Sequence, residues 1–598
     1  MNLDETKLST EFSLALQIPY SERVNSMDLN VGYNENFNNW ELIIIYTGNL
    51  EAISNEIGFT YNELLNGYAI IEIRQERINN LTRHPDIIFI EKPKKIYVEK
   101  LNHVSNSFED ENMENRRISN VYSAKNDFIY NNVRYGYIQG FVQSCMEFSR
   151  RQEVNLLGKG VLVSVIDSGI DITHPEFIDI NGNTRILNLW DQSLKYNDNS
   201  GVYTRQDIND ILRDIANDNI NVVNTRDSSG HGTAVGGIIA TCVPEADLLI
   251  VKLNPDAEDA YPRTTSLMLA IDYAVRYATL YNLPHVINLS FGNNYGSHDG
   301  NSVLEHYISS LSGKSKLSIA VGTGNDGNTG RHTRIFVDDN RISDVEVLVP
   351  EYTTGINIQV WQSYLDNIDI SLITPEGTVL GPFSGYQEVI TYRLYDMNIQ
   401  IINGYPTPIN RNRETYIALI PDGSYIREGI WTIRLRGRNI SNGIVDIWLP
   451  VAASTSTDVH FLRPVADVTL TIPSSARGVI CVGAYNQNTL TYAPFSGRGY
   501  NADGIIKPDI VAPGVNIDVP VSGGGYTYVS GTSFATPFVA SACAMLMQWG
   551  IVNENDLYLY GEKIRAYLIK GAKRLPTYND LPNEMLGYGA LCVRDSFP

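Results

Sequence analysis

The sequence contains few cysteines and few basic residues. The first shortage bears on the redox compartment of the protein, and the second bears on the partners that it can bind. Acidic residues number 67 against 46 lysines and arginines, for a formal net charge of −21. A protein that binds the phosphate backbone of a nucleic acid needs a surface rich in lysine and arginine, so nucleic acid is excluded as a partner. The five cysteines follow no metal-ligand spacing, and a sparse, odd set is typical of buried thiols in a reducing compartment: Cys145, Cys242, Cys481, Cys543 and Cys592.

Long apolar runs are also missing. The first ten residues, MNLDETKLST, are charged where a secretory signal would be apolar, so we expect no such signal. No run has the length and hydropathy of a membrane span. The only basic cluster, KPKK at 92–95, is expected to be a solvated strand end. These features predict synthesis and retention inside a cell or a spore.

Four short segments carry chemistry. VIDSGI contains Asp167, GHGTAVGG contains His231, VGTGND contains Asn325, and SGTSFATPFVA contains Ser533. A serine hydroxyl at its normal pKa is a poor nucleophile and needs a base. That base needs a partner that holds its tautomer, and the tetrahedral oxyanion needs a donor. The four segments supply one candidate for each role.

Each of these residues also has a simpler structural interpretation. Asp167 could cap the turn after VLVSVID, and His231 could be a hydrogen-bonded residue opening a buried helix. Ser533 could be only the N-cap of the apolar run that follows it, and Asn325 could occupy a turn. An N-cap position is compatible with catalysis, because a helix N-terminus favours the developing negative charge. The conjunction of all four favours an acyl-transfer site.

The chain order Asp, His, Ser is that of the subtilisin class. VSVIDSGI, DSSGHGTAVGG, HVINLSFG, SIAVGTGNDG and VSGTSFATPFVASACAML resemble its signature segments, and RGVICVGAYN and KPDIVAPGV extend the match from about 158 to 589. The resemblance implies a serine endopeptidase in which Asp167 orients His231, His231 is the base and Ser533 the nucleophile. It assigns Asn325 to the oxyanion hole.

The same resemblance assigns the substrate cleft. It implies that Ser290, Phe291 and Gly292 pair with an extended substrate and that Gly324 also contacts it. Asp326, beside the cleft, would favour a basic residue. The segment GIIATCVPEADLLIVKL has no room for the calcium loop of many relatives, so no metal and no cofactor are expected.

The pattern of apolar runs predicts an α/β fold. Short runs rich in Val and Ile alternate with helix-length segments, which favours a parallel sheet with helices on both faces. MLAIDYAVRYATLYN, at 268–282, is expected to be one of those helices. Active sites of such sheets lie outside the carboxyl ends of the strands.

The length favours several units. We expect a propeptide at 1–99, a linker at 100–134, the catalytic domain at 135–330 and 459–598, and an inserted antiparallel jelly-roll at 331–458. The order of elements in the first unit resembles the ferredoxin-like α+β propeptides of subtilases, although an unrelated α+β domain would show a similar pattern. Such propeptides place their C-terminal tail in the active site. Autocleavage is expected between Val98 and Gln143.

This combination of propeptide and insert resembles the Csp-type germination proteases of clostridial spores. The resemblance implies that the cleaved propeptide stays bound and that the enzyme activates a cortex-lytic hydrolase zymogen by limited proteolysis. Two alternatives remain open. One is an intracellular subtilase of general function, and the other is a pseudoprotease with a binding or scaffold role.

Overall fold

The computed structural model describes 3–97, 140–194, 201–217, 225–254, 261–383, 386, 388–394 and 396–598, together with the backbone of 128–130 and 133–135. Most of the expected linker and of the expected cleavage interval lies outside these residues. The two backbone segments pair as a short antiparallel ribbon, β6 (Phe128–Tyr130) and β7 (Val133–Tyr135).

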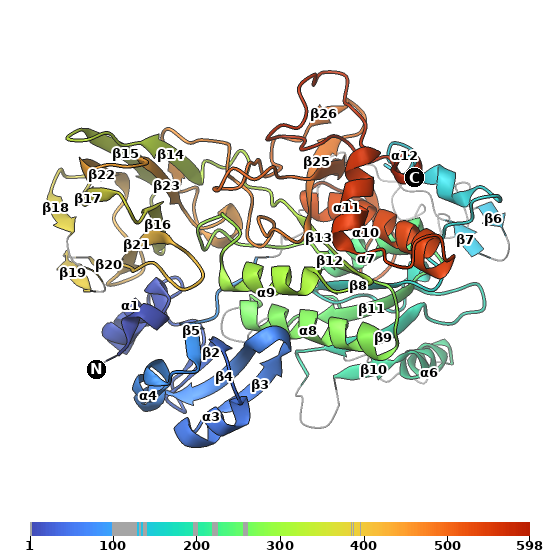
Figure 1. Cartoon of the computed structure of the whole chain (residues 1–598), viewed down its shortest axis with the longest axis horizontal. Coiled ribbons are helices and arrows are strands. Elements are labelled where there is room, and N and C mark those ends of the chain that lie inside the picture. Colours follow the sequence, from blue (N-terminus) through green and yellow to red (C-terminus); the bar gives the residue numbers. More distant parts are fainter. Residues whose placement is uncertain are drawn as a thin grey trace, which may run out of the picture.

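A largely parallel sheet forms the centre of the catalytic unit (Figure 1). Strands β9, β11, β8, β12, β13, β25 and β27 pair in parallel in that order, while β10 and β26 pair antiparallel with β9 and β25. Their bounds are β8 (Leu162–Asp167), β9 (Ile186–Asp191), β10 (Val202–Thr204), β11 (Asp247–Lys252), β12 (His285–Leu289), β13 (Leu317–Gly322), β25 (Ile480–Asn486), β26 (Thr491–Tyr492) and β27 (Ile510–Pro513). The central strands are continuous apolar runs because both faces of the sheet are buried.

Helices cover both faces, as expected. Helices α7 and α10 share one apolar core with the sheet, and α8 and α9 share another on the opposite face. The helices of this unit are α6 (Arg205–Ala216), α7 (His231–Cys242), α8 (Thr264–Leu280), α9 (Val303–Ser312), α10 (Thr532–Met547), α11 (Gly561–Lys570) and α12 (Val593–Ser596). A hairpin, β28 (Ile517–Pro520) with β29 (Tyr526–Val529), precedes α10.

One segment, Thr532–Val552, is long and apolar enough to cross a membrane by length and composition alone. It contains α10, and 89% of its most apolar window is buried inside the protein. Its apolar character is therefore explained by packing in the core between sheet and helices.

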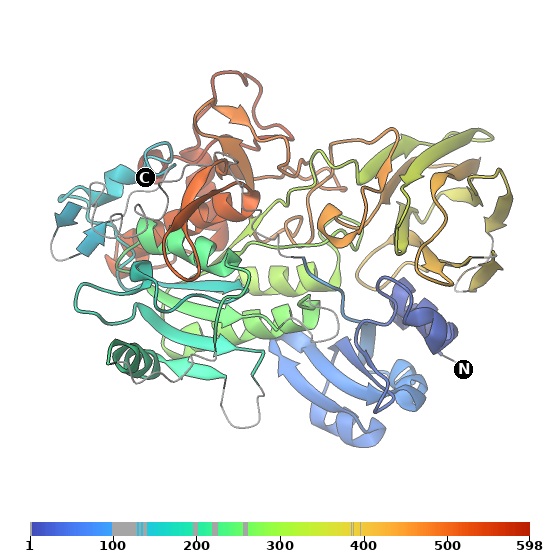
Figure 2. The same ribbon diagram turned by 180° about the vertical axis from the view of Figure 1, so that it is seen from behind.

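The N-terminal unit has the β-α-β-β-α-β order of a ferredoxin-like fold. Its antiparallel sheet has the order β5-β2-β4-β3, and β1 pairs with β2 at one end. One face of this sheet packs on α8 and α9. The other face is covered by helices of the same unit, and the first of them, α1, also contacts the inserted unit (Figures 1 and 2). Its elements are α1 (Thr10–Gln17), α2 (Tyr20–Arg23), β1 (Tyr33–Asn34), β2 (Asn39–Tyr46), α3 (Leu50–Ile57), β3 (Thr60–Leu64), β4 (Tyr68–Arg74), α4 (Ile78–Arg83) and β5 (Ile87–Glu91).

The basic cluster that follows β5 is not the solvated strand end that its composition indicated. Lys92 is completely buried, and its Nζ donates to the Asp28 carbonyl at 2.9 Å. Lys94 Nζ donates to the Tyr295 carbonyl of the catalytic unit at 3.3 Å. The cluster lies inside the junction between units, where carbonyl and carboxylate oxygens replace water around the ammonium groups.

The insert is a sandwich of two antiparallel sheets around one apolar core. The sheets have the strand orders β14-β23-β16-β21-β20-β19 and β18-β17-β22-β15-β24. Alternating burial along strands such as β22 explains the apolar-polar pattern of the sequence. The strands are β14 (His332–Phe336), β15 (Ile342–Val349), β16 (Ile356–Ser363), β17 (Asn367–Ile373), β18 (Val379–Phe383), β19 (Ile390–Arg393), β20 (Met397–Asn403), β21 (Asn412–Pro421), β22 (Gly429–Asn439), β23 (Ile444–Trp448) and β24 (His460–Phe461).

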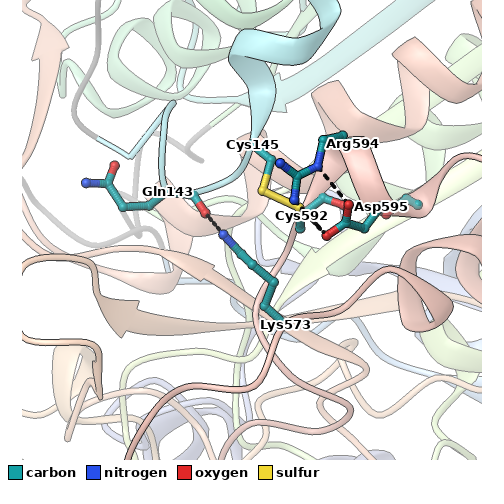
Figure 3. Close-up of a disulfide and its surroundings, with 7 residues drawn as sticks. Gln143, Cys145, Lys573, Cys592, Arg594 and Asp595 are labelled. Carbon is teal, nitrogen blue, oxygen red and sulfur yellow. Dashed lines mark hydrogen bonds and ion pairs between the residues drawn. A yellow bond between two sulfur atoms is a disulfide. The ribbon is translucent and has the colours of Figure 1, made fainter.

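The expectation of unpaired thiols is wrong for two of the five cysteines. Cys145 and Cys592 form a disulfide between residues 447 positions apart, with their Cα atoms 4.9 Å apart (Figure 3). Nearby, Lys573 donates to the Gln143 carbonyl at 2.6 Å, and the Val593 amide donates to the Ser144 carbonyl at 2.9 Å. The segment after the expected linker thus meets the C-terminal residues, a proximity that no spacing in the sequence encodes. The other three cysteines are free and buried, and burial raises the pKa of each thiol to about 12.

Candidate active site

The four predicted chemical residues meet at one edge of the central sheet. Asp167 is the last residue of β8, and Asn325 follows the end of β13. His231 is the first residue of α7, and Ser533 is the second residue of α10. Because the parallel strands end at one edge and α7 packs against α10 on the face behind it, these distant segments converge.

Asp167 and His231 form a buried pair. Their Oδ1 and Nδ1 atoms lie 2.8 Å apart, and both side chains are almost completely excluded from solvent. The same carboxylate oxygen accepts from the Ser168 amide at 2.7 Å. The Phe534 ring lies beside the imidazole, with ring centroids 5.6 Å apart. The imidazole is therefore held in one orientation by a carboxylate on one side and by an aromatic ring on another.

Ser533 lies in the first turn of α10, where its carbonyl lacks the usual helical donor. Its Oγ donates to the Ser290 carbonyl at 2.9 Å, so the hydroxyl must rotate before it can give a proton to a base. Pro537 lies four residues later and has no amide to donate to the Ser533 carbonyl. That carbonyl instead accepts from Ser290 Oγ at 3.1 Å. Ser290 thus fastens the nucleophile segment to the end of β12.

Asn325 is oriented by its acceptor atom. Its Oδ1 accepts from the Thr532 amide at 2.9 Å, which leaves Nδ2 available towards the cleft next to Ser533. Gly324 has a φ of +83°, and a Cβ there would lie 2.3 Å from the Thr471 side chain. Only glycine therefore allows the loop after β13 to approach this wall so closely.

A second carboxylate, to which the sequence motifs assigned no role, supports the histidine segment. Asp227 is buried and accepts from the Gly230 amide at 2.9 Å, from the Thr233 amide at 2.8 Å and from Ser168 Oγ at 2.8 Å. Ser168 Oγ in turn accepts from the Gly232 amide at 3.0 Å. This network sets the position of the first turn of α7. The sequence signal is that Asp227 is the first residue of the segment DSSGHGTAVGG, four positions before His231.

A cleft of about 170 Å³ adjoins the nucleophile. Ser533 and Asn325 line this cleft. The four residues expected to contact substrate line it as well: Ser290, Phe291, Gly292 and Gly324. Val451, Ala452 and Ala453, which follow the sandwich strand β23, form another part of the wall. The insert therefore contributes directly to the shape of the cleft.

The tail of the N-terminal unit enters this cleft and pairs there with the catalytic unit. Tyr97 forms an antiparallel bridge with Gly292, its amide donating to the Gly292 carbonyl at 3.2 Å. On the other edge, the Ile96 amide donates to the Pro262 carbonyl at 2.8 Å. The Tyr97 ring lies 4.7 Å from that of Tyr261 and also lines the cleft. Residues 94–97 are thus held between two segments of the catalytic unit, as an extended peptide would be.

Asp326 lines the cleft, as expected, although its side chain is largely buried. Its selection of a basic substrate residue stays a prediction. Its carboxylate accepts from Asn294 Nδ2 at 3.2 Å, from Thr329 Oγ1 at 3.2 Å and from the Ala452 amide at 3.3 Å. Burial raises its pKa. Asp326 braces the cleft wall against the loop after β13.

Within the part of the chain that the structure describes, no three His, Cys, Asp or Glu side chains form a group that could hold a metal ion. The expectation that this protein works without a metal stays a prediction.

Comparisons with known proteins agree with this architecture. The model of the subtilase family matches 158–387 and 436–589, and the Csp protease B prodomain matches 6–94. The structure of the Clostridium perfringens CspB protease is 34% identical, with a TM-score of 0.71, and covers 76% of this chain and 96% of that chain.

Curated relatives are more distant and much longer. The PIII-type proteinase of Lactococcus lactis subsp. cremoris is 25% identical over 461 residues, covering 68% of this chain and 23% of that protein. The C5a peptidase of Streptococcus pyogenes serotype M1 is 26% identical over 419 residues, covering 65% and 34%. The chain thus spans between about a quarter and a third of these relatives. The family matches, the CspB structure and the fold together show that this chain belongs to the subtilase family of serine peptidases and is a subtilase of the Csp type with an N-terminal prodomain.

Proposed function

We propose that this chain is a serine endopeptidase that uses Asp167, His231 and Ser533, processes its own prodomain and then activates a spore cortex-lytic hydrolase zymogen. The observation that carries the catalytic part has two sides: Asp167 pairs with His231 beside Phe534, and Ser533 and Asn325 line one cleft that already holds an extended segment. The spore location and the zymogen substrate rest on similarity to the Csp group.

The chemistry follows from the geometry. Asp167 holds the His231 ring through Nδ1, so that the other ring nitrogen takes the proton when the Ser533 hydroxyl turns away from the Ser290 carbonyl. The oxygen of Ser533 attacks the peptide carbonyl, and negative charge develops on the carbonyl oxygen. Asn325 Nδ2 and the Ser533 amide at the start of α10 stabilise that charge. His231 then returns the proton to the leaving amine.

The prodomain tail supports self-processing and retention. Residues 94–97 pair with the same cleft segments that would bind a substrate, so the tail has the register of an amino-terminal cleavage product. The buried apolar faces shared with α8, α9 and the sandwich hold the prodomain in place after cleavage. In this state the prodomain acts as an inhibitor that a protein substrate must displace.

Intact mass spectrometry of the wild-type protein and of Ser533→Ala tests the catalytic proposal. We expect two fragments from the wild type and one chain of 66.8 kDa from the variant. After the prodomain is removed, a fluorophosphonate should label only the wild type. A cleaved Ser533→Ala protein, or a wild type that is neither cleaved nor labelled, would instead support a scaffold role. Incubation with a purified cortex-lytic zymogen tests the substrate: conversion by the wild type and none by Ser533→Ala is expected.

A further inference from the structure

A second cavity, away from the catalytic cleft, lies where the prodomain, the sandwich and the catalytic unit meet. Its volume is about 50 Å³, and a cavity needs about 10–15 Å³ to hold one water, so it admits a ligand of only a few heavy atoms. The prodomain contributes Ser9 and Glu11, the sandwich contributes Trp361 and Glu414, and the catalytic unit contributes Ser302. None of these side chains belongs to the candidate active site described above.

Three buried polar atoms from residues lining this cavity have no hydrogen-bond partner. They are Glu414 Oε1, Ser9 Oγ and Trp361 Nε1. Glu414 is 7% exposed and Ser9 is 8% exposed. Ser9 is the N-cap residue of α1, yet its hydroxyl makes no capping bond. Buried polar groups are nearly always paired. Glu414 Oε1 and Ser9 Oγ can both accept a hydrogen bond and therefore indicate a ligand that donates, whereas the Trp361 N–H is itself a donor and is not satisfied by such a ligand.

The charges around the cavity indicate the sign of the charge on that ligand. Lys92 lies 3.6 Å from a Glu11 carboxylate oxygen, and Lys94 lies 2.9 Å from a Glu91 oxygen. Each lysine thus has its own carboxylate, and among the described residues no cation forms a salt bridge with Glu414. Burial and the nearby negative charges of Glu11 and Glu91 raise the pKa of Glu414, while Lys94 lowers it. Once Glu414 has lost its proton, the uncompensated charge at this junction is negative.

We propose that this cavity binds a small primary ammonium ion, with the Glu414 carboxylate as its counter-ion. The aromatic side chains of Phe89, Trp361 and Tyr405 also line the cavity, and aromatic rings beside a carboxylate suit an organic ammonium group. A divalent cation such as calcium would need six to eight oxygen ligands. A bound ammonium ion donates to Glu414 Oε1 and to Ser9 Oγ, which are acceptors on different units.

Such a ligand would couple to the assembly of the protein. Its site includes prodomain and sandwich residues at once, so it exists only while the prodomain is docked, and binding stabilises that docked state by mass action. Binding also requires the charged form of Glu414. Affinity therefore increases as the pH rises through the raised pKa of Glu414, as long as the amine itself stays protonated.

Saturation-transfer NMR with methylammonium chloride tests the site on the full-length Ser533→Ala chain, which cannot separate from its prodomain by triad-dependent cleavage. At pH 8.5 we expect saturable binding. At pH 6.0, and after a second substitution Glu414→Gln at pH 8.5, we expect binding at least about tenfold weaker. Glu428→Gln is the matched control, since Glu428 is an exposed glutamate of the same unit and should bind as the parent does.

Several results would overturn this inference. These are no saturable binding up to about 100 mM methylammonium, unchanged binding in Glu414→Gln, or displacement by equal concentrations of KCl, which would indicate a general cation effect. If Glu414→Gln does not fold, Trp361→Phe decides: it removes only the indole N–H and the larger ring, and severalfold weaker binding is expected. Unchanged binding in that variant would place the amine elsewhere.

Discussion

Replacing Asn325 by alanine is the sharpest test of the oxyanion hole. The structure separates the two ends of this side chain: Oδ1 accepts from the Thr532 amide at 2.9 Å, and Nδ2 is left for the substrate. Losing one preorganised donor costs about 100- to 1000-fold in rate, or about 2.7–4 kcal/mol, a range measured in subtilisin itself. We therefore expect Asn325→Ala to convert its precursor about 100- to 1000-fold more slowly than the wild type, and Ser533→Ala not to convert it.

Asn325→Asp is the matched variant for this experiment. It keeps an acceptor for the Thr532 amide, so the start of α10 should be unchanged, but it places negative charge where the oxyanion forms. We expect it to be slower than Asn325→Ala although it perturbs the fold less. The assay is a time course of precursor loss during cell-free synthesis, followed by intact mass. Conversion by Asn325→Ala within about threefold of the wild type would refute the assigned role.

Three further predictions rest on other contacts. Asp227→Asn should lower turnover about tenfold or more with little change in circular dichroism, because an amide nitrogen cannot accept from the amides that now set the position of α7; wild-type turnover would show that this network is not needed. Replacing Cys145 and Cys592 together by serine should lower the melting temperature by the equivalent of about 2–4 kcal/mol, and dithiothreitol should do the same to the wild type but not to the variant. Tyr97 pairs antiparallel with Gly292, and a register that continues in this way predicts Glu99 opposite Ser290. Mass spectrometry should therefore find a fragment that ends at Glu99. A cut far into the following segment would contradict that register.

The signature segments were predictable because each is a local pattern. Asp167 at a strand end, His231 and Ser533 at helix starts, and Asn325 after a strand all follow from apolar runs and helix caps that short stretches of sequence encode. The parallel sheet and the antiparallel insert were predictable for the same reason, since burial on two faces or on one face leaves a different periodicity in the strands. The expected helix at 268–282 is present as α8, at Thr264–Leu280.

Contacts between distant segments were not predictable in this way. The bond between Cys145 and Cys592 depends on where two ends of the catalytic unit meet, and spacing alone indicated unpaired thiols. Asp227 belongs to the histidine segment, but its role follows only from the amides that the folded loop directs towards it. Asp326 lies beside the cleft as expected, but the bond that it accepts from the Ala452 amide depends on how the segment after the sandwich strand β23 docks.

The amino-acid order by itself determined the family, the type of each unit and the identity of the chemical groups, because these depend on neighbours within a few turns or strands. Only the tertiary structure determined that Cys145 and Cys592 are paired, which residue Tyr97 pairs with in the cleft, and that three units form a cavity around Glu414. Each of these depends on how separately patterned surfaces dock. Docking is governed by the shape and charge of side chains brought together from hundreds of residues apart, and no periodicity along the chain records that complementarity.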